Sequence, residues 1–499
     1  MTDLAATTLA TGTLPGLPSR HWIDGGWHDA ASGRTMESFD PGSGKAFASF
    51  ARGDAADVQA AVDAALAAMT GRWRGITPSE RGRILMRTAE LIRANAEFYA
   101  VVECLDCGKP VGEARVDVAS AARAFEYYAG ACDKMHGLTI PLGHDYLAYS
   151  VNEPVGVTAH VIPWNYPIST TARGVAPALA AGCTVVAKPA EQTPLTALLL
   201  AETLKQAGLP DGVYNVVTGT GAEVGAPLVS HPGIAHVAFT GSVATGCSVM
   251  QAAARNVTSV TLELGGKSPA VVMADCDIET AAADILAAIY ENAGQICSAA
   301  ARVVIERAAQ AEFLDRFVAG VRTLSLGHGL RNPRVGPVNS PNQLERISDF
   351  VEGARANGTE IVTGGSRTSD PDTGLGWFFE PTVLNNVKMS DRVAQNEIFG
   401  PVLCVQPFDD IEEAVAIANS TNFALVAGVY TSDFGTAHRL ARDIDAGQVF
   451  INEYFAGGIE IPFGGNRHSG IGREKGLEGM RNYLRVKSVA ARTSPRRTH

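Results

Sequence analysis

Cysteine is scarce in this sequence, with 8 in 499 residues. So few cysteines cannot form a disulfide framework in a chain of this length, and we expect reduced thiols and a cytoplasmic protein. Cys104 and Cys107 have the spacing of metal ligands, but no second pair or nearby histidine completes such a site. We therefore expect no bound metal and assign all cysteines except Cys297 to small buried residues.

Positive charge is also in deficit, since 41 Lys and Arg face 52 Asp and Glu, for a net charge of -11. This balance provides no electrostatic footprint for nucleic acid. The first residues lack a basic segment that leads into an apolar one, so we expect no signal peptide. The apolar stretch 175–187 is short and interrupted by Pro177 and Gly182, which argues against a membrane-spanning helix.

Helices and strands alternate along most of the chain, which predicts an α/β fold with largely parallel sheets. From residue 155 onward, short apolar strands joined by helical links predict a doubly wound dinucleotide-binding fold. Its ligands are expected at the carboxyl ends of the strands. A second α/β set begins at 269–273 and is predicted to form a separate domain. The extended segments 144–153 and 482–491 fit neither set.

Two segments carry candidate reactive groups. The apolar strand VTLELGGK (260–267) delivers Glu263 and then breaks at two glycines. The segment GQIC (294–297) offers Cys297 with little apolar cover on its Gly-Gln side. A thiol nucleophile and a carboxylate base are the two halves of a covalent mechanism. No histidine is close to Cys297 in sequence, so a Cys-His protease is not indicated.

Two further loops follow predicted strands. In IPWNYP (162–167), Asn165 stands between aromatic residues in a rigid two-proline loop, an unusual choice for a plain turn, although Trp164 and Tyr166 also suit a core. In AKPAEQTP (187–194), Lys188 ends a strand and Glu191 precedes a helix start. A donor and an acceptor at this edge can both reach the diol of an adenosine ribose. The alternative is a surface Lys-Glu pair.

Two glycine-rich turns are candidates for phosphate contact. GTGAEVG (219–225) resembles a dinucleotide fingerprint, but its spacing is off by one and no acidic residue follows at the usual distance. FTGSVATG (239–246) also joins a strand to a helix. There Gly241 permits close approach of the backbone, and Ser242 can donate to a phosphate near a helix N-terminus. The alternative is an ordinary strand-helix turn.

With EIFGP (397–401) and PFGGNRHSGIGREKG (462–476), these motifs resemble the aldehyde dehydrogenase superfamily, in the expected order from about Trp27 to Lys487. The resemblance implies an α/β fold with a Rossmann-like cofactor domain at 1–129 and 153–265. It also implies a second α/β catalytic domain at 266–465. A small β oligomerisation flap and a C-terminal segment take 130–152 and 466–499, and the chain is expected to form a homodimer or homotetramer.

The resemblance assigns roles to the reactive residues. Cys297 attacks an aldehyde, and Asn165 with the Cys297 N–H stabilises the oxyanion. Glu263 activates the water that releases the carboxylic acid, while Glu474 either assists proton transfer or holds the backbone. The cofactor is expected to be NAD, because Glu191 would repel a ribose 2′-phosphate. The residues expected to bind it are Ile162, Pro163, Trp164, Lys188, Glu191, Gly221, Gly225, Phe239, Gly241, Ser242, Leu264, Glu397 and Phe399.

The resemblance also implies a substrate tunnel. Its expected lining is Tyr166, Arg173, Glu291, Ile296 and Ser298. Arg173 either binds a distal carboxylate of the substrate or pairs with Glu291 at the tunnel mouth. Glu291 is charged where many relatives are aromatic, and Ile296 stands where some relatives have a second cysteine.

Two alternatives remain at this point. In a CoA-acylating relative, CoA rather than water would resolve the thioester, and Glu263 argues against this because such an enzyme needs no hydrolytic base. A non-catalytic protein on the same fold is disfavoured because Cys297, Glu263, Asn165 and Lys188 are all present. NADH production with a panel of aldehydes separates the three readings.

Overall fold

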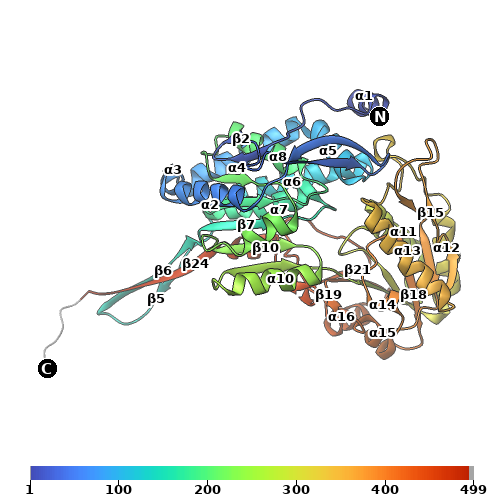
Figure 1. Ribbon diagram of the computed structural model, residues 1–499. Helices are drawn as coiled ribbons and strands as arrows, with labels where there is room; N and C mark the ends of the chain where they lie inside the picture. The colour runs from blue at the N-terminus through green and yellow to red at the C-terminus, as the bar shows by residue number, and fades with distance from the viewer. Residues whose placement is uncertain (1, 494–499) are drawn as a thin grey trace.

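The computed structural model describes residues 2–493, which form two α/β bodies and a projecting antiparallel sheet (Figure 1). The predicted α/β class with mixed, largely parallel sheets is confirmed. The end of the predicted C-terminal segment, 494–499, lies outside the described residues.

The first body is built on an eight-stranded sheet whose five central strands are parallel. Val185 and Val186 lie next to each other on β8 but belong to two hydrophobic clusters, because successive side chains on a strand point to opposite faces. Helices therefore cover both faces, as a parallel sheet requires. The strand order is β2 (Gly26–His28), β1 (His21–Ile23), β9 (Tyr214–Val216), β8 (Thr184–Lys188), β7 (Val157–Val161), β10 (His236–Thr240), β11 (Ser259–Glu263) and β23 (Gly470–Ile471).

The helices of this body lie on the two faces of the sheet. One of them, α4, begins with a capping box, in which Thr77 and Glu80 bond each other's backbone N–H. At the start of α8, Pro194 occupies the N-cap and makes no side-chain cap bond. The helices are α2 (Ala55–Thr70), α4 (Pro78–Ala94), α5 (Ala96–Cys107), α6 (Val111–Ala131), α7 (Pro167–Ala181), α8 (Leu195–Gln206) and α10 (Val243–Ala254), and the ribbon β3 (Thr35–Asp40) and β4 (Lys45–Ala51) lies beside them.

The second body has a seven-stranded sheet, parallel except for its edge strand β14. Its order is β14 (Glu360–Thr363), β17 (Thr382–Asn385), β18 (Val402–Phe408), β13 (Arg302–Glu306), β12 (Pro269–Val272), β20 (Val426–Tyr430) and β21 (Gln448–Ile451). The helices α11 (Ile278–Tyr290), α12 (Arg307–Val321), α13 (Pro341–Ala356), α15 (Ile411–Ala418) and α16 (Phe434–Asp443) pack around it.

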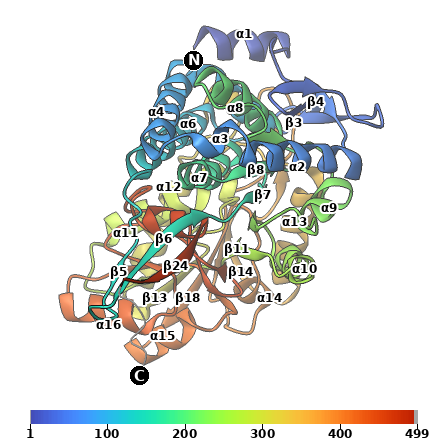
Figure 2. The same cartoon turned by 90° about the vertical axis from the view of Figure 1, so that its left-hand side faces the viewer.

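The two extended segments that fit neither body pair with each other. β6 (Tyr146–Pro154) and β24 (Leu484–Arg492) run antiparallel over nine residue pairs, and β5 (Thr139–Ile140) adds a short third strand. Figures 1 and 2 show this sheet extending away from the first body. Before reaching it, the chain leaves the second body and places β23 beside β11, with Gly470 opposite Glu263. The pairing of β23 with β11 thus connects the two bodies next to Glu263, a predicted catalytic residue.

The structure also bears on cysteine burial, membrane-spanning helices and metal-binding groups. Cys104 and Cys107 are buried on α5 as predicted, but Cys247 is exposed and Cys276 is partly exposed, so the expectation of burial is wrong for these two. Within 2–493 no helix is both long and apolar enough to cross a membrane. The same residues contain no group of three or more His, Cys, Asp or Glu side chains arranged to hold a metal ion.

Candidate active site

A cavity of about 1220 Å³ lies between the two bodies, at the carboxyl ends of β7, β8, β10 and β11. All predicted site residues line it except three. Gly225 is buried beside the Lys188 side chain, and Glu263 and Glu474 lie behind the wall. The carboxyl ends of parallel strands therefore gather residues from distant parts of the chain, as expected for ligand sites in such sheets.

The segment before Cys297 has an uncommon backbone. Asn292, Ala293 and Gly294 are consecutive left-handed residues, with φ of 47°, 53° and 72°. The Asn292 N–H donates to Glu113 at 2.9 Å, and its side-chain amide donates to the Asn165 carbonyl at 2.9 Å. Backbone strain of this kind persists only where the surroundings enforce it. The strained segment leads directly into Cys297, which lines the cavity.

Cys297 is partly exposed to the cavity, while much of its surroundings is protein. Burial raises the pKa of its thiol to about 12, although the charge of Arg173 acts in the opposite direction. In the ligand-free protein the sulfur is therefore protonated at neutral pH, and a base must assist the formation of the nucleophilic thiolate.

Asn165 lies beside the nucleophile at the start of α7. It is 6% exposed and lines the cavity. Its amide nitrogen donates to the Gln295 carbonyl at 2.9 Å, so one of its two hydrogens is committed and orients the group. Gln295 is itself fixed by the Asn339 N–H at 2.9 Å. The amide is thus tied to the segment that carries Cys297.

Glu263 ends β11 and is 1% exposed. Neither carboxylate oxygen has a hydrogen-bond partner among the described residues. Burial, followed by the neighbouring charge of Glu474, raises the pKa of Glu263 well above its usual range. A carboxyl group that is buried, unsatisfied and near a thiol is poised to exchange a proton with a small molecule.

Arg173, on α7, forms an ion pair with Glu474. The alternative pairing predicted for Arg173, with Glu291, is not formed, because Glu291 instead accepts a hydrogen bond from the Tyr166 hydroxyl at 2.9 Å. Glu474 is also held through its backbone, whose N–H and carbonyl both bond Phe463. Glu474 is therefore held behind the cavity wall in two ways, by its ion pair with Arg173 and by its backbone hydrogen bonds to Phe463.

The other end of the cavity has the donors and acceptors of a nucleotide site. The Lys188 ammonium lies 3.0 Å from a Glu191 oxygen, with Lys188 buried and Glu191 a third exposed. Ser242 caps α10 by accepting from the Thr245 N–H, which places it at the first turn of a helix. Amide groups and the helix dipole favour an anion there.

The middle of the cavity is shaped by Glu397 and Phe399. Glu397 accepts from the Gly266 N–H at 2.9 Å, and a Cβ on Gly265 would collide with its carboxylate. Burial raises the pKa of Glu397 to about 7. Phe399 adopts φ of 61° and meets Trp164 edge to face, with ring centroids 5.2 Å apart.

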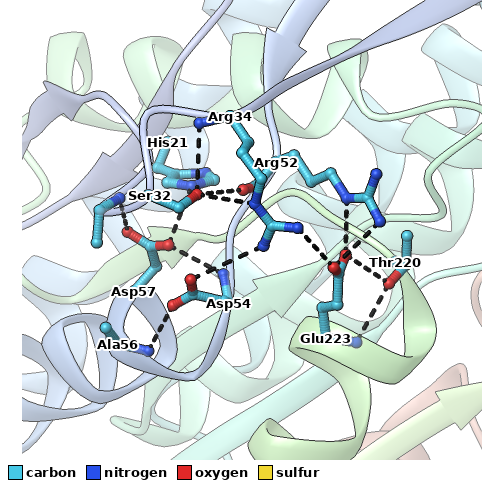
Figure 3. A network of polar contacts seen from close by, with 10 residues as sticks. His21, Ser32, Arg34, Arg52, Asp54, Ala56, Asp57, Thr220 and Glu223 are labelled. Carbon is cyan, nitrogen blue, oxygen red and sulfur yellow. Dashed lines mark hydrogen bonds and ion pairs between the residues drawn. The ribbon is translucent and has the colours of Figure 1, made fainter.

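The turn that contains Gly221 is held from outside the cavity. Figure 3 shows Arg34 and Arg52, which flank the same end of the β3–β4 ribbon, converging on Glu223, with Thr220 beside it. Hydrogen bonds from Arg52, then Arg34, lower the pKa of Glu223 to about 2. This network fixes the π-helical turn Gly221–Gly225 against the N-terminal ribbon.

Several residues that matter to this geometry were missed from the sequence: Glu113, Asn292, Gln295 and Lys475. Asn292 and Gln295 flank Gly294 in the motif that holds Cys297, so polar residues beside a glycine were an available signal. Glu113 carried no local signal, because its contact with Asn292 joins positions far apart in the chain. Lys475 stands out only as a charge within a glycine-rich segment.

Comparisons with known proteins agree with this geometry. The aldehyde dehydrogenase of Aspergillus niger is 40% identical over 98% of each chain, and aldehyde dehydrogenase 1 of Tanacetum cinerariifolium is 43% identical over 94% of each. The structure of betaine aldehyde dehydrogenase from Staphylococcus aureus in complex with NAD+ is 36% identical, covers 99% of both chains and has a TM-score of 0.96. The model of the aldehyde dehydrogenase family matches residues 27–489, and the chain therefore belongs to the aldehyde dehydrogenase family.

Proposed function

We propose that the protein oxidises an aldehyde to the carboxylic acid with NAD+, through a thiohemiacetal and a thioester on Cys297. The protein is an aldehyde dehydrogenase, and NAD-dependent aldehyde oxidation is the reaction of this oxidoreductase. The observation that carries the assignment of residues is the placement of Cys297 on the cavity wall with the unsatisfied carboxyl group of Glu263 behind it.

The residues at the nucleotide end fit NAD. Lys188 and Glu191 supply a cation and an acceptor for a ribose diol, and Ser242 supplies a hydroxyl at a helix N-terminus. Glu397 and Phe399 line the same cavity as Cys297. Bound NAD+ supplies the acceptor for the hydride that leaves the aldehyde carbon. Glu191 disfavours a 2′-phosphate by charge repulsion and so favours NAD over NADP.

The first chemical stage takes place on the thiol. The sulfur of Cys297 bonds to the aldehyde carbon as the thiol proton passes to solvent water in the cavity, and the electron pair of the carbonyl π bond moves to the oxygen, which becomes an oxyanion. The Asn165 amide and the Cys297 N–H donate to that oxygen, as an oxyanion hole does. Loss of the hydride restores the carbonyl group and leaves a thioester.

The second stage depends on Glu263. In its ionised form Glu263 takes a proton from water, whose oxygen attacks the thioester carbon; the carbon–sulfur bond breaks and the acid leaves. The raised pKa of Glu263 makes it a stronger base than an exposed carboxylate once it is ionised. Glu474, compensated by Arg173, raises that pKa and so tunes the base.

The test is NADH formation with a panel of aldehydes, with and without CoA. Turnover that requires no CoA supports hydrolysis, whereas turnover that begins only with CoA would assign the acylating reaction. No NADH with any aldehyde would favour the non-catalytic alternative. The variant Cys276→Ala is a matched control for thiol chemistry, because Cys276 lies outside the cavity.

We also infer the organisation of the chain and its assembly. The two sheets support a cofactor domain at 1–129 and 153–265 and a catalytic domain at 266–465. The projecting sheet supports a flap for homodimer or homotetramer formation, since Leu138, Leu147 and Val486 on or near it are 69%, 50% and 71% exposed. Eight free cysteines support a reducing, cytoplasmic location. Light scattering of the purified protein measures the oligomeric state.

A further inference from the structure

Lys475 occupies an unusual position on the substrate side of the cavity. It directly follows Glu474 and has φ of 58°, a left-handed conformation that side chains rarely adopt. Its neighbours are tied down: Glu474 bonds Phe463 through its backbone, and the Gly476 N–H donates to the Ile459 carbonyl at 2.6 Å. Strained residues held in this way concentrate at ligand sites.

The ammonium of Lys475 has no anionic partner. Within 2–493 it forms no hydrogen bond and no ion pair, although its side chain is partly buried and lines the cavity. It lies 5.2 Å from the centroid of the Phe463 ring. The other cation over that ring, Arg173, is compensated by Glu474. A partly desolvated charge without a counter-ion is unfavourable and is stabilised by an incoming anion.

The surrounding charges support an excess of positive charge at this corner. Burial, followed by the charge of Arg173, lowers the pKa of Lys475 to about 8, so the ammonium form predominates at neutral pH. Burial raises the pKa of the Cys297 thiol to about 12, so this thiol is uncharged there, and burial also raises the pKa of Glu263 above its usual range. Glu460, which also lines the cavity, is already paired with Arg123 at 2.5 Å. Of the charges that face Lys475, Arg173 and Glu474 cancel, and Lys475 remains.

We propose that Lys475 binds a carboxylate carried by the aldehyde substrate, so that short oxo acids are preferred to neutral aldehydes; this inference rests on the proposed function. Lys475 and Cys297 line the same cavity, so a carboxylate bound by Lys475 and an aldehyde carbon at Cys297 can belong to one small molecule. The carboxylate contact considered for Arg173 therefore belongs to Lys475, since Arg173 already has its anion.

The experiment compares three aldehydes in the wild-type protein: 4-oxobutanoate, its methyl ester, and a trimethylammonium aldehyde of similar length. We expect kcat/KM for 4-oxobutanoate to exceed that for the ester by roughly 10- to 100-fold, the usual range for a hydrogen bond to a charged group. The difference should appear mainly in KM. Equal values for acid and ester, or a preference for the cation, would overturn the inference, while NADH formation from the ester would leave the proposed function standing.

Variants assign the preference to one residue. Lys475→Met removes the positive charge and should abolish the preference, whereas Lys475→Arg keeps the charge and should retain most of it. The two variants are comparable because both replacements meet the same backbone strain at this φ. Lys388→Met is the matched control, since Lys388 is exposed and outside the cavity, and it should behave as wild type. Persistence of the preference in Lys475→Met, or its loss in Lys475→Arg despite normal folding, would refute the role of Lys475.

A pH series in the wild type provides an arm that needs no variant. Titrations of Cys297 and Glu263 affect the acid and the ester alike, so they cancel in the ratio of their kcat/KM values. The ratio should fall as pH rises through about 8, because Lys475 loses its charge there. The series should cover about pH 6 to 9, that is, from roughly two units below the pKa of Lys475 to roughly one unit above it. A ratio that stays constant over this range would contradict the inference.

Discussion

Two groups of buried carboxyl groups flank the substrate side of the cavity, and they differ in how their oxygens are satisfied. In the acid network behind Tyr166, both Glu103 oxygens accept from the Ile168 N–H at 3.2 Å, and Asp117 pairs with Lys109. In the reactive corner, formed by Glu263, Cys297, Arg173, Glu474 and Lys475, neither Glu263 oxygen has a partner.

Burial raises the pKa of carboxyl groups in both places, so a raised pKa alone does not identify a catalytic residue. The acid network is satisfied internally: Thr196 donates to Glu103 at 3.0 Å, and Lys109 also covers the face of the Tyr166 ring at 3.7 Å. The carboxyl groups of Glu103 and Asp117 each already have a partner within the protein. Among the described residues Glu263 has no such partner, which is why we assign the chemistry to the reactive corner and a supporting role to the network.

The largest effect is expected for Cys297→Ala. Turnover should fall by at least about 10³-fold, because the thiol forms the covalent bond, while NAD+ affinity by calorimetry should stay within about twofold of wild type. The control Cys276→Ala should retain wild-type turnover. Substantial activity in Cys297→Ala would remove the nucleophile from the reactive corner.

Glu263→Gln should have the next largest effect. It keeps the shape of the side chain but cannot accept the proton of water, so steady-state turnover should fall by about 10²–10⁴-fold. Stopped-flow absorbance should still show a burst of NADH, because the thioester forms before Glu263 is needed. If the burst disappears too, Glu263 acts on the thiol and not only on water.

The acid network should respond in stability instead of chemistry. Lys109→Met leaves Asp117 buried without its cation and should lower the free energy of unfolding by about 3–5 kcal/mol. Replacing both partners, as Lys109→Met with Asp117→Leu, should recover much of that loss. Denaturant titration provides the measurement, and an unchanged midpoint in Lys109→Met would mean that this pair contributes nothing.

The smallest effect concerns pH. Burial raises the pKa of Glu103 from its usual 4.5 to about 8, so between these values the folded protein holds a proton that the unfolded chain releases. This contribution to stability is complete below pH 4.5 and is lost as pH rises toward 8. Glu103→Gln mimics the protonated form and should flatten that decline in unfolding midpoints measured at several pH values. Parallel curves for the two proteins would contradict the assignment.

Much of the fold could be predicted because its signals are local. The alternation of apolar strands and helices identified the α/β class, and the structure has the largely parallel sheets that this alternation predicts. The positions of Lys188 and Glu263 at the carboxyl ends of their own strands could also be predicted in this way. The solvent exposure of individual side chains could not be predicted in this way: Cys247 and Cys276 were expected to be buried, but Cys247 is exposed and Cys276 is partly exposed.

The sequence by itself determined the order of elements and the family resemblance, and it supplied the candidate reactive side chains, because each depends on short-range patterns. Only the tertiary structure decided which charges meet. Arg173 forms an ion pair with Glu474 and not with Glu291, and Lys475 forms no ion pair within residues 2–493, since these contacts depend on how β23 and the segment after it return to the first body. Electrostatic energies depend on distance and burial, and neither can be read from the spacing of residues along a chain.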